Sequence, residues 1–98
     1  MGNRLVWLQQ AYDDLSALHE YISANNGRAA DAYVEDIFAA CERLSQFPLS
    51  GRVYNSVYRA LVVRNHLVFY RFDENEEQIV IVAVLHGHRN IAALFPDE

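Results

Sequence analysis

The sequence predicts an α+β fold: an N-terminal strand, then an antiparallel helical hairpin packed on a small, mostly antiparallel β-sheet. Two observations predict it. Apolar residues recur at helical spacing through the first half of the chain, and segments dense in Val, Leu, Phe and Tyr fill the second half. A chain of 98 residues has room for one modest core, so we expect a single domain over residues 1–98.

The chain opens with a short strand and a helix. Arg4–Trp7 is apolar and bounded by polar residues, which is typical of a strand. From Gln9 to Ala24 the apolar residues follow a 4-3-4 spacing that indicates an amphipathic helix. This stripe consists of Ala11, Leu15, Leu18 and Ile22. Asp13 and Asp14 lie in the early turns, where the helix dipole favours negative charge, and Asn-Asn-Gly at 25–27 ends the helix.

A second helix is predicted from about Arg28 to Gln46. Its buried stripe consists of Val34, Ile37, Cys41 and Leu44, widened by Ala30, Tyr33 and Phe38. Pro48 cannot continue the helix, and Ser50-Gly51 is a turn signal. Two helices of similar length joined by a tight turn form an antiparallel hairpin.

The remainder of the chain is β-rich. Tyr58–Arg64 and His66–Phe72 predict a β-hairpin that turns near Asn65. Gln78–His86 is apolar at both alternating positions, which favours a strand in the middle of the sheet with both faces covered. We expect the helices to cover one face and a partner protein the other, so that the free chain is poorly soluble. Asn90–Phe95 is predicted to form one helical turn.

The composition narrows the class of protein. No apolar run reaches the ~18–20 residues of a membrane helix, and the N-terminus lacks the apolar stretch of a secretory signal. The single cysteine, Cys41, cannot form an internal disulfide and suits a reducing compartment. We therefore expect a cytoplasmic protein that does not bind membranes. No phosphate loop or catalytic triad motif is present, and no cofactor is expected.

The charge pattern bears on partners. A net charge of −5 without any lysine should be repelled by a polyanion, so we expect no sequence-specific nucleic-acid binding by this chain alone. Four arginines and no acid lie between Leu49 and Phe72, whereas the preceding segment carries seven acids and three arginines. Either a local basic face docks on an acidic protein surface, or these strand arginines pair with acids on the helices.

Several short motifs occur in a fixed order between Val6 and Arg89. They are V-W-x-x-x-A-x-x-D-L at Val6–Leu15 followed by Tyr21-Ile22, Ala29-Ala30, L-x-x-x-P-x-x-G-R at Leu44–Arg52, Arg59, Tyr70-Arg71, and V-x-H-x-x-R at Val84–Arg89. No single motif is specific. The ordered set resembles the ParE/RelE toxin superfamily, and most closely its ParE branch.

The resemblance implies the toxin of a type II toxin–antitoxin module, which a ParD-like antitoxin binds and neutralises in a hetero-oligomer. ParE-type toxins poison DNA gyrase, whereas RelE-type toxins cut messenger RNA on the ribosome. A third alternative is a family member that is no longer toxic and only forms complexes. By position in the family motifs, the residues expected to contact the target are Arg52, Arg59, Arg71, His86 and Arg89.

A ribonuclease would need a general acid and base close to cations that surround the phosphate. His86 is the natural acid or base, because histidine titrates near neutral pH, and Arg59, Arg71 and Arg89 would be the cations. Three features count against this chemistry: the chain has no lysine, no tyrosine follows Tyr70, and the net charge is acidic. They favour the gyrase-directed branch, whose toxins act without catalysis of their own.

These functional assignments have structural alternatives. Arg89 is the strongest single candidate for a target contact, and its alternative is an ion pair with the C-terminal acids or with Glu76-Glu77. Arg59 and Arg71 fit an ion pair with the acidic helices equally well. His86 and His88 would share one face of a continuous strand, but only His66 is available as a third ligand, so no metal site is expected.

Overall fold

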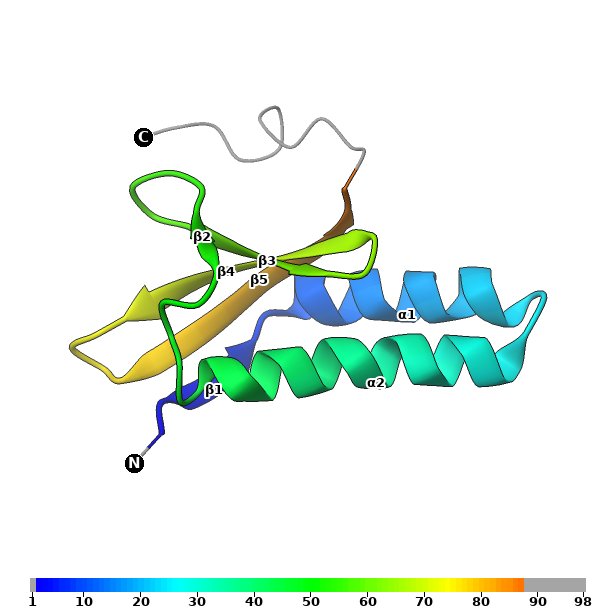
Figure 1. Cartoon of the computed structure of the whole chain (residues 1–98), viewed down its shortest axis with the longest axis horizontal. Coiled ribbons are helices and arrows are strands. Elements are labelled where there is room, and N and C mark those ends of the chain that lie inside the picture. Colours follow the sequence, from blue (N-terminus) through cyan, green and yellow to red (C-terminus); the bar gives the residue numbers. More distant parts are fainter. Residues whose placement is uncertain (1, 88–98) are drawn as a thin grey trace.

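The computed structural model describes residues 2–87, in which two helices pack on one face of a five-stranded sheet (Figure 1). The elements are β1 (Arg4–Trp7), α1 (Gln9–Ser23), α2 (Gly27–Leu44), β2 (Arg52–Val53), β3 (Arg59–Val63), β4 (His66–Asp73) and β5 (Gln78–His86). The strand order is β1-β5-β4-β3-β2, with β1 parallel to β5 and the other neighbours antiparallel. The predicted α+β class is confirmed. The predicted turn at 90–95 lies outside the described residues, as do His88 and Arg89.

β5 is an interior strand, as the sequence predicts: it lies second in the strand order, between β1 and β4. Its continuous apolar pattern reflects neighbours on both edges and side chains buried on both faces. β2 was not predicted, because two residues are too few for a periodic pattern. β2 depends on long-range pairing with β3, which local periodicity does not specify.

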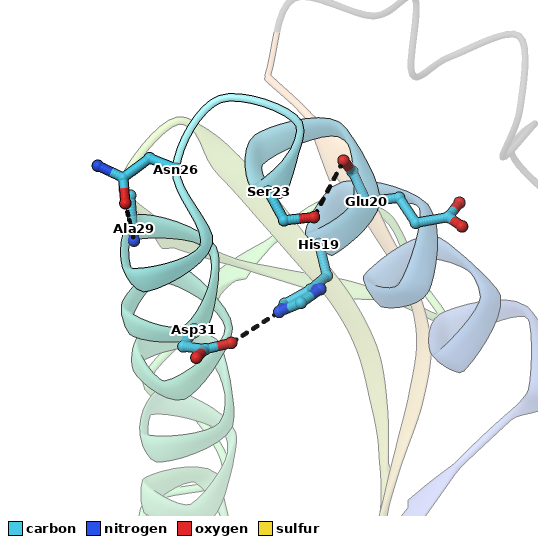
Figure 2. Close-up of polar contacts among 6 residues, drawn as sticks. All are labelled: His19, Glu20, Ser23, Asn26, Ala29 and Asp31. Atoms are coloured by element: carbon cyan, nitrogen blue, oxygen red, sulfur yellow. Dashed lines mark hydrogen bonds and ion pairs between the residues drawn. The ribbon is translucent and has the colours of Figure 1, made fainter.

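The helical hairpin is closed by polar contacts at its turn (Figure 2). Asn26 is the N-cap of α2, and its Oδ1 accepts a hydrogen bond from the Ala29 N–H at 3.1 Å. His19 on α1 pairs with Asp31 on α2 across the hairpin, with Nε2 2.7 Å from Oδ1. No acidic residue lies in the first turn of α1, so the expected dipole role of Asp13 and Asp14 is wrong.

The main core lies between the helices and the sheet. Its buried residues from the helices are Ala11, Leu15, Ile37, Ala40, Cys41 and Leu44. Of the predicted stripe, Phe38 is 39% exposed and packs against Trp7 with the two rings tilted by 53° and a centroid distance of 5.1 Å. It therefore packs at the edge of the core. Within residues 2–87, neither helix is long and apolar enough to span a membrane.

The burial of Cys41 predicts an unreactive thiol. Burial raises the pKa of the Cys41 thiol to about 12, so almost no thiolate is present at pH 8. We expect a disulfide reagent to label the native chain only as fast as the core opens, and to label one thiol at once in denaturant. Rapid stoichiometric labelling of the folded protein at pH 8 would show that the thiol is accessible.

The second face of the sheet, which the sequence analysis assigned to a partner protein, is largely covered by side chains of the chain itself. Ala60, Phe69, Ala83 and Leu85 form a second buried cluster with relative exposures of 0–9%. Tyr54, Tyr58, Leu67 and Val82 pack against this cluster, and the Tyr54 ring meets that of Phe69 edge to face at 5.3 Å. The argument for poor solubility from an uncovered apolar face is therefore lost.

Candidate functional site

The connection between α2 and β2 is fixed by the buried Tyr70. Its hydroxyl donates a hydrogen bond to the Pro48 carbonyl at 2.8 Å and accepts one from the Gly51 N–H at 2.9 Å. Burial raises the pKa of Tyr70, and the Gly51 N–H and the nearby Arg59 partly oppose that rise. A neutral hydroxyl can donate and accept at once, which is what these two contacts require.

Arg59 serves the same connection. Its Nη1 donates hydrogen bonds to the carbonyl of Gly51 at 2.9 Å and to that of Leu49 at 3.3 Å. The guanidinium therefore fixes the main chain of the Leu49–Gly51 segment. Within residues 2–87 it makes no ion pair with an acid on the helices. Of the residues expected to contact a target, Arg59 has a structural role on this geometry.

Arg52 and Arg71 are exposed on the sheet face that points away from the helices. Arg52 is opposite Ala60 in the β2–β3 register, and Ala60 belongs to the second cluster on that face. Arg71 follows Tyr70, whose side chain faces the helices, and so projects to the other side. Neither arginine forms an ion pair within the described part of the chain. They are therefore available for an external acidic partner.

Arg64 pairs with an acid on a helix, which is the structural alternative that the sequence analysis gave for these arginines. Its Nε donates to Oδ2 of Asp36 on α2 at 2.8 Å, and the guanidinium lies 4.8 Å from the centre of the Tyr33 ring. Arg64 adopts a positive φ of 53° at the β3–β4 turn, a conformation that is uncommon outside glycine. The pair ties the edge of the sheet to α2.

His86 lies at the end of β5 on the helix side and meets a residue that was not among the candidates. His86 and His66 are register partners, with ring centroids 5.2 Å apart. Nδ1 of His66 lies 2.6 Å from the Tyr33 hydroxyl, which also accepts the Asn65 N–H at 3.2 Å. Burial, and then the proximity of His86, lower the pKa of His66.

These side chains line a cavity of about 450 Å³ between α1 and the end of the sheet. Leu18 and Ile22 of α1 form its apolar wall, and Tyr21, which is 81% exposed, lies at its rim. Asp14 lines the same cavity. No group of three or more His, Cys, Asp or Glu within residues 2–87 is arranged to hold a metal ion.

Asp14 also completes the edge of β5. β1 pairs with β5 only as far as Ile81, so the following edge of β5 has no neighbouring strand. The Val84 N–H on that edge donates to Oδ2 of Asp14 at 2.9 Å. A side chain from α1 thus satisfies a strand donor that would otherwise be exposed to another chain. The sequence analysis had named Asp14 in a motif and as an acid in an early helical turn, and not as a partner of β5.

The candidate residues do not form one site. Arg71 is the register partner of Val80, and His86 lies six residues further along β5, a separation of about 20 Å. Arg59 and Arg71 are also on opposite faces of the sheet. The ribonuclease set of His86 with Arg59 and Arg71 is therefore not brought together, and Arg89 lies outside the described residues.

A family profile described as the ParE toxin of the type II toxin-antitoxin system, parDE, matches residues 5–91. The chain belongs to the ParE toxin family. Toxin ParE3 of Caulobacter vibrioides is 32% identical over 94 residues, which cover 92% of each chain. Toxin RelE2 of the same bacterium is 29% identical over 86 residues, which cover 88% of this chain and 97% of the relative. The predicted superfamily is confirmed.

Solved structures share the fold of this ParE-family chain at low sequence identity. The chromosomal ParDE system from P. aeruginosa matches with a TM-score of 0.74 and 21% identity, over 86% of this chain and 95% of that chain. The toxin–antitoxin complex RelBE2 from Mycobacterium tuberculosis matches with a TM-score of 0.63 and 23% identity, over 88% and 99%. A free-state mutant of E. coli RelE matches with a TM-score of 0.70 and 9% identity, over 96% and 93%. Both branches therefore share this architecture, and the fold alone does not choose between their targets.

Proposed function

We propose that this chain is a toxin that acts by binding DNA gyrase and not by cutting messenger RNA. The observation that carries the proposal is the separation of His86 from Arg59 and Arg71 by most of the length of β5. Acid–base catalysis on RNA needs the proton-transfer group and the phosphate-binding cations within reach of one substrate. The net charge of −5 points the same way, because a protein that binds the ribosome must approach a polyanion.

The proposal includes a ParD-like antitoxin that binds and neutralises the toxin in a hetero-oligomer. The structures with the same fold include a ParDE system and a RelBE2 toxin–antitoxin complex, which supports a partner of this kind. The relatives named ParE3 and RelE2 are themselves toxins. Because the sheet face away from the helices is already covered by tyrosines, the antitoxin is not needed to bury that face.

Arg52 and Arg71 are the target contacts that we propose among the described residues. They are exposed on one face and make no ion pair within residues 2–87, which suits an acidic protein surface. Changing both to glutamate should reduce toxicity at least tenfold, measured as survival after induction in growing cells. Arg28→Glu is the matched control for each of the two single variants, because Arg28 is exposed on α2 and the change in net charge is then the same. An equal loss of toxicity in the control would show that the effect comes from the change in net charge.

The His86→Ala variant separates the two mechanisms. On the gyrase account it should still arrest growth, because His86 is remote from Arg52 and Arg71. On the ribonuclease account, growth arrest and mRNA cleavage should disappear together. Primer extension measures the mRNA cleavage. A wild-type chain that does not arrest growth at all would identify a non-toxic member that only forms complexes.

A further inference from the structure

Two histidines that the proposed function does not use meet on the helix side of the sheet. His66 opens β4 and His86 ends β5, and their direct cross-strand pairing fixes both side chains on one face. Directly opposed side chains in an antiparallel pair start about 4.5–5.5 Å apart at Cβ. Both rings line the cavity beside α1, so a small ion can reach them from solvent.

We propose that His66 and His86 form a binding site for a borderline divalent transition-metal cation, with Zn²⁺ as its representative. Imidazole nitrogens bind Zn²⁺ tetrahedrally at 2.0–2.1 Å, which places the centroids of two bound rings about 5 Å apart. The observed centroid distance is 5.2 Å. The rings lie edge to face at 84°, so a rotation about χ2 of the exposed His86 is needed to direct one nitrogen of each ring at a common point. This torsion of histidine is broad and roughly two-fold.

The surroundings of His66 suit a metal ligand. The Tyr33 hydroxyl occupies Nδ1 at 2.6 Å, which orients the ring and leaves Nε2 as the ligating nitrogen. Metal-bound histidines usually have such a hydrogen-bond partner on their other nitrogen.

Nearby charges are compatible with a cation. Asp14 lines the same cavity, and its two carboxylate oxygens are held by Gln10 and the Val84 N–H. It therefore contributes negative charge and not a coordinating atom. Arg64, which lines a neighbouring cavity together with His66, is paired with Asp36. With two protein ligands and water in the other positions, binding should be weaker than at structural sites that have four protein ligands.

The test is a titration of the tag-free, full-length chain with zinc chloride. Calorimetry measures the binding, and imidazole ¹H–¹⁵N correlation spectra show which histidines are affected. One Zn²⁺ should bind per chain, with the largest changes at the resonances of His66 and His86. His66→Ala and His86→Ala should each weaken binding at least tenfold. Tyr33→Phe should weaken it as well, since the partner of a ligating histidine affects affinity by about 10–100-fold. His19→Ala is the matched control: His19 pairs with Asp31 and does not line the cavity that holds His66 and His86, so binding should be unchanged.

A thermal measurement gives a second readout. Zn²⁺ at about five times its Kd should raise the Tm by about 4–8 °C, and this rise should vanish in His66→Ala. No saturable binding by the folded wild-type chain would overturn the proposal. So would binding that survives His66→Ala but disappears in His88→Ala, since the metal would then be held elsewhere.

Discussion

Replacing Gly51 with alanine is expected to lower the free energy of unfolding by about 1–3 kcal/mol. A Cβ at this position would lie 2.7 Å from both Cε1 and the hydroxyl of Tyr70, and 3.1 Å from the Ala60 carbonyl. Tyr70 cannot move aside at low cost, because it is fully buried and its hydroxyl bonds Pro48 and Gly51. Urea unfolding followed by circular dichroism measures the loss.

Gly27→Ala is the control for the conformational effect of adding a methyl group. No atom lies within 4 Å of a Cβ at Gly27, which begins α2, so this variant should be neutral or slightly stabilising. A Gly51→Ala protein as stable as the wild type would mean that the segment around Gly51 can shift at little cost in free energy. Tyr70→Phe should also destabilise, by about 1–3 kcal/mol, because the Gly51 N–H loses its buried acceptor.

The Asp14→Ala variant is expected to lose about 1–3 kcal/mol, because the partly buried Val84 N–H then has no acceptor. Asp14→Asn should recover part of this loss, since an amide oxygen can still accept. Asp13→Ala is the matched control: Asp13 is exposed and bonds only the Gln9 side chain among the described residues. Its effect should stay within about 0.5 kcal/mol.

The same variant should expose an edge of the sheet. Without Asp14 the β5 edge beyond Ile81 offers an unpaired donor, and such edges favour association between chains. Asp14→Ala should therefore aggregate faster than Asp13→Ala at equal concentration, measured by light scattering. Equal stability and equal aggregation of the two variants would show that the Asp14 contact contributes little to the fold.

The local elements could be predicted from the sequence because their patterns are strong and short-ranged. Arg4–Trp7 and Gln78–His86 are observed with the predicted ends, and α1 ends one residue before the predicted Ala24. Each is defined by periodicity or by turn residues within the segment itself. The β2 strand has no such pattern and exists only because it pairs with β3.

The candidate site was less predictable, because it depends on the register between neighbouring strands and on which face of the sheet each side chain occupies. The pairing of His66 with His86 needs the alignment of β4 on β5, which includes an irregularity between Phe69 and Tyr70. A shift of one residue would place the two rings on opposite faces. The sequence offered Arg59 either as a target contact or as the partner of a helix acid, and only the fold of the Leu49–Gly51 segment shows that its guanidinium bonds main-chain carbonyls.

The most direct test of the central claim is a DNA cleavage assay with purified toxin, gyrase, supercoiled plasmid and ATP, scored for linear DNA after detergent and protease. The account predicts that linear DNA accumulates with increasing wild-type chain, persists with His86→Ala, and falls with the Arg52→Glu and Arg71→Glu double variant. No linear DNA at a large excess of folded wild-type chain, together with cleavage of messenger RNA on ribosomes, would contradict it.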